Sequence, residues 1–183
     1  MAAITSGEIL FKYSVAAAAG NTTAQPTPAL SLGDQISTTV WSGSVLNDLF
    51  DDVTGAENSA SVADYRCIFV HNSNSANALQ NAVVYISGEV AGGTTISLAV
   101  DTVGVVAIGS GSAQALVATN ETTGPQTSLT YSTAAVSPAT GLALGSIGTG
   151  QCRAFWIKRQ ASNSSALTGD GVTISVTGDT GAL

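Results

Sequence analysis

Acidic side chains gather between residues 42 and 65, in the stretch SGSVLNDLFDDVTGAENSASVADY. Calcium binds carboxylate and carbonyl oxygens in flexible loops, so this stretch is a candidate cation site. Its spacing does not match the EF-hand pattern, and the alternative is that Asp51 or Asp52 caps a short helix while the remaining acids are solvated. We favour this alternative. The candidate metal ligands are Asp48, Asp51, Asp52 and Glu57.

The only histidine, His71, lies in the segment YRCIFVHN, residues 65–72, together with Cys67. A catalytic histidine needs a nucleophile beside it, and no serine lies in a GxSxG motif. Two cysteines and one histidine are too few for a structural zinc site. We therefore expect no enzymatic activity and no cofactor. His71 would be bonded to a backbone carbonyl or exposed at the end of a buried strand.

Aromatic side chains offer a second kind of chemistry, because an exposed ring can stack on the face of a sugar. Trp41, Tyr131 and Trp156 are the candidates for such a platform. The aromatic residues lie mostly in segments predicted as strands, which favours packing in the core. Cleavage of a glycosidic bond would also need two carboxylates facing each other in a groove, and no such pair is evident.

The elements that position these residues are predicted to be β-strands. Apolar and polar residues alternate in segments 8–15 and 171–178, and segments 65–72 and 151–160 carry apolar residues on both faces. Segments 16–19 and 45–50 could form only a helical turn or two. We expect an all-β, single-domain antiparallel β-sandwich, similar to a jelly roll, with seven to nine strands over residues 1–183. Residues 1–33 would supply an N-terminal strand and an extended arm.

Segment 65–72 is expected to be a central strand covered on both sides, because both of its faces carry large side chains. The core residues predicted there are Tyr65, Cys67, Ile68, Phe69 and Val70. Cys67 and Cys152 are expected to be free, buried thiols, with a disulfide between them as the less favoured alternative.

Charge and composition narrow the choice of partners. Charged residues are only 9% of the chain and its formal net charge is −7. Five basic residues are too few to follow a phosphate backbone or an anionic membrane, so we expect no nucleic-acid or membrane partner. The N-terminus lacks a signal-peptide pattern, which predicts synthesis in a cytoplasm.

Three of the five basic residues lie in the strand QCRAFWIKRQ, residues 151–160. Arg153 and Arg159 share a face with two apolar residues, and Lys158 lies on the other face. The strand could form an interface with an acidic partner. We favour the alternative that it is a core strand whose charged ends pair with acids of segment 42–65.

Several segments together resemble a group of tailed-phage virion structural proteins. An acidic stretch, residues 51–53 with Glu57, leads into the strand 65–70 and Asn72. A late strand that follows glycines ends in Trp-Ile-Lys-Arg, residues 156–159. The resemblance covers the middle and C-terminal two-thirds of the chain.

This resemblance implies a non-enzymatic subunit on the outer surface of the virion head, made in the host cytoplasm. It would be a capsid decoration, or cement, protein that bridges neighbouring subunits of the major capsid protein and associates with copies of itself as a trimer or dimer. The alternatives are a protein of the tail, neck or fibre attachment, and a receptor- or carbohydrate-binding module. The residues expected at subunit interfaces are Met1, Ala2, Ala3, Ile4, Trp41, Arg153, Lys158 and Arg159.

Overall fold

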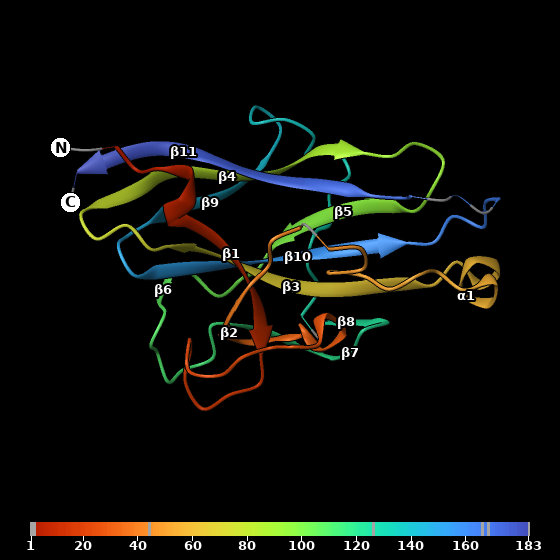
Figure 1. The fold of residues 1–183 in the computed structure, drawn as a ribbon, viewed down its shortest axis with the longest axis horizontal. Coiled ribbons are helices and arrows are strands. Elements are labelled where there is room, and N and C mark those ends of the chain that lie inside the picture. Colours follow the sequence, from red (N-terminus) through yellow and green to blue (C-terminus); the bar gives the residue numbers. More distant parts are fainter. Residues whose placement is uncertain (1–2, 44, 126, 166, 168, 183) are drawn as a thin grey trace.

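A computed structural model describes residues 3–43, 45–125, 127–165, 167 and 169–182, and their regular structure is almost entirely β (Figure 1). The larger sheet has eight strands in this part of the chain and is curled. Across it the strands are β5 (Thr95–Val100), β10 (Gln151–Gln160), β3 (Ala63–Asn72), β1 (Ile9–Val15), β2 (Gly33–Val40), β7 (Ala115–Asn120) and β8 (Thr123–Pro125), with β6 (Val106–Ala107) paired to β10.

The smaller sheet has three strands, in the order β11 (Val172–Ala182), β4 (Asn77–Glu89) and β9 (Leu142–Ile147). Figure 1 shows β11 and β4 lying over β10 and β3, with the start and the end of the chain at the same end of the molecule. The pairings in both sheets are antiparallel. The predicted all-β antiparallel sandwich is therefore confirmed. The eleven strands of the described residues exceed the expected seven to nine because they include β6 and β8, which are only two and three residues long.

Two apolar clusters form the core, one on each face of the larger sheet. The first lies between the sheets and includes Ile68, Val70 and Phe155. The second lies inside the curl of the larger sheet and includes Cys67 and Trp156. Strands β3 and β10 contribute to both clusters and pair with each other along their full length. Their apolar runs on both faces follow from this position, because a strand covered on both sides has no solvated face.

The N-terminal strand, β1, lies inside the larger sheet between β2 and β3. A short 3₁₀-helix, η1 (Ser6–Glu8), precedes it, and the backbone N–H of Ile4 donates to Thr180 Oγ1 on β11 at 3.1 Å. The loop after β1 contains a second 3₁₀-helix, η2 (Pro28–Leu30), and buried Gln25, whose amide donates to the Leu30 carbonyl at 3.1 Å. From Ile4 onward, the segment expected as a strand and arm is thus part of the sandwich itself.

The α-helix of the described chain, α1 (Gly55–Ala60), lies further along than expected. Segment 45–50 makes only a single turn, from Asp48 N–H to the Val45 carbonyl. The helix begins at a capping box in which Thr54 Oγ1 accepts from Glu57 N–H at 3.2 Å and Glu57 accepts from Thr54 N–H at 2.7 Å. The sequence signal was Thr-x-x-Glu at residues 54–57, rather than the aspartates before it.

The buried carboxylate of Asp101, the residue that directly follows β5, accepts hydrogen bonds from two other strands of the larger sheet and from the next loop. Its Oδ2 accepts from Trp156 Nε1 at 2.8 Å and from Leu116 N–H at 2.9 Å, and its Oδ1 accepts from Val103 N–H at 2.8 Å. Asp101 is only 1% exposed. These donors, drawn from β10, β7 and the following loop, would otherwise be buried without partners, which is costly.

We expect Asp101→Ala to lower the free energy of unfolding by about 3 kcal/mol, because it leaves the Trp156 and Leu116 N–H groups unsatisfied. Chemical denaturation monitored by tryptophan fluorescence would measure the change. Asp179→Ala is the matched control. It removes an exposed aspartate that accepts one hydrogen bond from Asn81, and should change stability by about 0.5 kcal/mol or less. Equal effects of the two substitutions would contradict the role of Asp101.

Candidate functional site

The acidic segment is fastened to the sandwich by three side chains that bind its backbone carbonyls. We call residues 45–54 the acidic loop. Tyr13 Oη donates to the carbonyl of Asp48, Arg66 Nε donates to that of Leu49 at 3.0 Å, and Arg159 Nη1 donates to that of Asp51. Burial raises the pKa of Tyr13 to about 12, so its hydroxyl keeps the proton that it donates. The loop is thereby fixed over the end of β3 and β10.

Arg159 is the centre of this attachment. Its Nη2 lies 2.5 Å from Asp64 Oδ2 and 3.3 Å from Asp51 Oδ1, and its side chain is 9% exposed. The ring of Phe50, from the acidic loop, lies 4.8 Å from the Arg159 Cζ and 5.0 Å from the Arg66 Cζ. Cation–π attraction to one ring therefore adds to the ion pair. The favoured expectation for the strand 151–160, that its charged end pairs with acids of segment 42–65, is confirmed for Arg159.

Arg66 is fully buried at its side chain and pairs with Glu121 of the β7–β8 turn, Nη2 to Oε2 at 2.9 Å. Burial lowers the pKa of Arg66, and the Glu121 carboxylate opposes this shift. The sequence pattern assigned no role to Arg66, which alternates with Ile68 and Val70 along β3. An arginine in the middle of an apolar strand was the available signal, because such a charge needs a partner when it is buried.

The four candidate metal ligands do not converge. Asp51 is bound to Arg159, Asp52 Oδ1 accepts from Asn47 Nδ2 at 3.2 Å, and Glu57 caps α1. The hydrogen bonds from Thr54 lower the pKa of Glu57. Asp48 is half-buried at the turn that Tyr13 holds. Among the residues that the structure describes, no group of three or more His, Cys, Asp or Glu side chains is arranged to hold a metal ion.

His71 is buried near the end of β3, beside Leu10 of β1 and Cys152 of β10. No described residue makes a hydrogen bond to its Nδ1, so the expected bond to a backbone carbonyl is not seen there. Burial, with a smaller contribution from the charge of Lys12, lowers the pKa of His71 to about 4. The imidazole is therefore neutral at physiological pH and lies in the core.

Cys67 and Cys152 are free and buried, as expected. They lie on β3 and β10, where Cys67 is opposite Trp156 and Cys152 is opposite His71. Burial raises the pKa of Cys152 to about 12 and that of Cys67 well above its usual value. Both thiols are therefore protonated and act as small core side chains.

The aromatic candidates for a sugar platform are largely covered. Trp156 is fully buried, and Trp41 is 9% exposed and packs edge-on against Phe11 with ring centroids 5.7 Å apart. Tyr131 is half-buried and contacts Tyr65 edge-on at 5.6 Å. Both tryptophans are buried, so the carbohydrate-binding hypothesis loses its main support.

The residues expected at subunit interfaces lie in different parts of the molecule. Met1 and Ala2 lie outside the described residues, and Ala3 is exposed. Ile4 lines a groove beside β11. Arg153 donates to the carbonyls of Val103 and Asp101 at 2.5 and 2.8 Å, and Lys158 is half-buried. Trp41 and Arg159 are buried in the chain itself. The structure does not bring these residues together into one surface.

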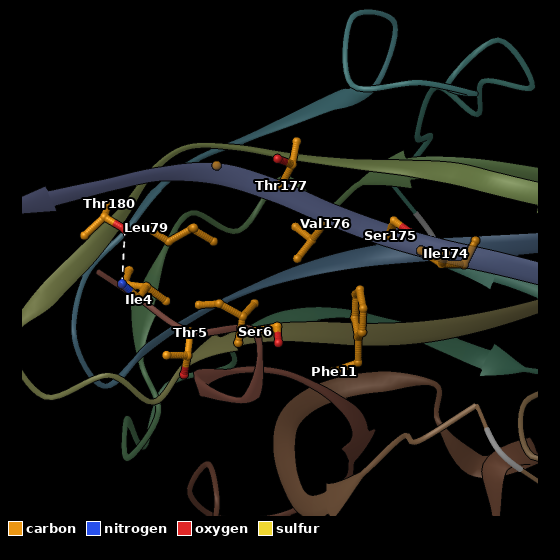
Figure 2. Close-up of a pocket in the computed structure, with 12 residues that line it drawn as sticks. Ile4, Thr5, Ser6, Phe11, Leu79, Ile174, Ser175, Val176, Thr177 and Thr180 are labelled. Atoms are coloured by element: carbon orange, nitrogen blue, oxygen red, sulfur yellow. Dashed lines mark hydrogen bonds between the residues drawn. The ribbon is translucent and has the colours of Figure 1, made fainter. Parts of the chain in front are cut away.

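Two hollows of the surface remain as candidate contact sites. The first, of about 370 Å³, is the groove between β11 and the start of the chain. Figure 2 shows Ile4 and Phe11 on one side of it, and on the other Leu79 and Val176, from the paired strands β4 and β11. The second, of about 750 Å³, lies between the acidic loop, where Val45 and Leu46 are 66% and 82% exposed, and described residues near the start of β11, among them Ser164, Leu167 and Asp170.

No protein-family model matches the sequence, and comparisons with curated proteins and with solved structures found no match. The resemblance to virion proteins thus depends on the motif residues alone. None of the helices in the described ranges has the length and apolar character needed to cross a membrane.

We expect Arg159→Ala to lower the free energy of unfolding by about 3 kcal/mol, because it leaves the carboxylate of Asp64 buried and unpaired. It should also free the acidic loop for early cleavage in limited proteolysis. Asp51→Asn is the control, because the Asp51 side chain is 69% exposed and its ion pair contributes less than about 1 kcal/mol. An acidic loop that stays resistant to protease in Arg159→Ala would contradict the attachment described above.

The low pKa of His71 predicts a dependence of stability on pH. The unfolded chain binds a proton at the ordinary histidine pKa of 6.5, whereas the folded chain does so only near 4. The contribution is therefore fully present above pH 6.5 and is lost as the pH falls toward 4, by up to about 3 kcal/mol. Comparison of unfolding free energies at several pH values for the natural chain and His71→Gln would show it. Curves of the same slope between pH 6.5 and 4 would refute the assignment.

Proposed function

We propose that the chain is a non-enzymatic structural subunit of a tailed-phage virion, a capsid decoration protein that bridges neighbouring subunits of the major capsid protein. The observation that carries this proposal is an exposed apolar surface at one end of the sandwich. We call Val45, Leu46 and Leu167 the loop-end surface; they are 66%, 82% and 43% exposed. They surround the larger hollow, whose lining also includes buried Trp41. Clustered exposed apolar side chains indicate a site of protein contact.

The motif residues support the proposal by their arrangement. The strand that includes 65–70 pairs with the strand that includes residues 156–159, and Arg159 of the second motif binds Asp51 of the acidic motif. Segments far apart in the sequence thus form one unit, which holds the acidic loop and its apolar tip in place. A resemblance that involves all these segments would be expected if related proteins present the same loop.

Charge suggests which kind of surface the loop end contacts. Asp51, Asp52 and Asp170 are exposed around the apolar residues, whereas the two arginines that bind the acidic loop, Arg66 and Arg159, are buried. An acidic rim around an apolar centre fits a partner with basic side chains around an apolar hollow. The proposed partner is therefore a basic, partly apolar site on the capsid shell. Repetition of this modest contact over many copies would reinforce the head.

The number of copies in a particle tests the proposal directly. Quantitative mass spectrometry of purified virions, produced from the genome that encodes this chain, should find hundreds of copies on the outer surface of the head. A few dozen copies or fewer would overturn the decoration role and favour the tail, neck or fibre attachment. Absence from the particle would overturn the virion assignment altogether.

A variant tests the loop-end surface. In a binding assay with heads that lack the chain, the double substitution Val45→Ser with Leu46→Ser should weaken binding about tenfold or more, because the buried apolar contact is lost. Val136→Ser is the matched control, since Val136 is 56% exposed and lies outside the loop-end surface. Equal binding of the double variant and the control would contradict this site of contact.

A further inference from the structure

Strand β11 forms an open edge of the smaller sheet. Strand β11 pairs with β4, and among the described residues no strand pairs with its other edge. The backbone N–H and C=O groups of such an edge are a template for another strand. Among the described residues, the start of the chain hydrogen-bonds to β11 at Thr180, through the Ile4 N–H. Residues 172–178 therefore carry the open part of the edge.

This edge lacks the side chains that usually prevent pairing between proteins. Natural edge strands are short or carry Lys, Pro or inward-pointing charges. Strand β11 is 11 residues long and reads VTISVTGDTGA, with Asp179 as its single charge. Shifts in its register with β4 occur after Thr173 and Thr177. Strand β9, at the opposite edge of the same sheet, has six residues and a glycine, Gly145, at φ +82°.

Beneath the open edge lies the groove of about 370 Å³. Ile174 and Val176 of β11 form one wall, and Ile9 and Phe11 of β1 belong to the other. All four pack against the core between the sheets; Ile174 is buried, and the other three are partly buried. In Figure 2 Val176 points toward Phe11, whereas Thr177 points away from the groove. A strand added at this edge would place its own inward side chains over the open groove.

The sequence of β11 identifies the added strand. Residues 173–177 read Thr-Ile-Ser-Val-Thr, which is almost the same in both directions. In antiparallel pairing with Ser175 opposite Ser175, each Thr173 is opposite a Thr177 and each Ile174 is opposite a Val176. Such pairing is self-complementary, as a two-fold interface requires. Thr–Thr pairs and β-branched pairs are among the favourable cross-strand contacts.

We propose that β11 of one copy pairs antiparallel with β11 of a second copy, with Ser175 on the two-fold axis, and joins the two smaller sheets into one continuous sheet. On the outer face, Ser87 Oγ lies 2.7 Å from Ser175 Oγ, so a row of hydroxyls crosses the joint. The Asp179 side chains of the two copies are eight positions apart along the paired strands, roughly 27 Å, well beyond the screening length of about 10 Å.

This pairing rests on the proposed function, in which the chain is a virion subunit present in many copies. It describes how those copies would associate with one another. It is tested with the purified chain alone, so that a failure here leaves the copy number in virions unaffected, and the reverse. Sedimentation velocity should show a dimer at tens of micromolar. Thr177→Lys places a charge on the open edge and should weaken the dimer about tenfold or more. Ser146→Lys places the same charge on β9, at the opposite edge, and should leave the dimer intact.

A cross-link tests the register. Ser175→Cys should form an intermolecular disulfide under mild oxidation, because the two introduced thiols face each other across the axis and both natural cysteines are buried. Ser146→Cys should not. A chain that is monomeric throughout, or a dimer that withstands Thr177→Lys and does not cross-link through residue 175, would overturn the proposal.

Discussion

The structure depends on one strand pair, β3 and β10, that is apolar on both faces and pairs over ten positions. Such a pair is stable only where both faces are covered, so the remaining strands are arranged around it. The smaller sheet covers one face and buries residues such as Ile68 and Phe155. The curl of the larger sheet covers the other and buries Cys67 and Trp156. Cys67, His71 and Trp156, whose types suggested chemistry, are therefore buried in the core.

The same pair fixes the charged groups at its end. Arg66 and Arg159 leave the paired strands on the side of the acidic loop, and each binds a carbonyl of that loop. A buried guanidinium needs a partner, because a charge that is removed from water and left unpaired strongly destabilises the fold. The acids Asp64 and Glu121 meet this need. The acidic loop is consequently a fixed platform, on which Val45 and Leu46 are held out toward solvent.

The two proposed contacts, at the loop-end surface and at the open edge of β11, lie outside the buried strand pair. The loop end presents apolar side chains on a fastened loop, and β11 presents backbone groups beside an open groove. The chain has few charges with which to keep copies apart, which suits a subunit that works in contact with others. A shell contact at one place and a contact between copies at another would allow each subunit to bridge neighbours.

The sequence by itself determined the all-β sandwich, the two-faced strands at 65–72 and 151–160, and the burial of both cysteines, because alternation and apolar runs depend only on neighbouring residues. The helix at 55–60 was also recoverable from its capping box. The sequence also indicated that Arg159 pairs with acids of segment 42–65, but only the tertiary structure decided which acids these are, and that Asp101 binds Trp156 and Arg66 binds Glu121, each 55 positions away. The tertiary structure also decided which strand became an open edge. Strand order is set by pairing between distant segments, and no local pattern in β11 distinguishes an edge from a centre.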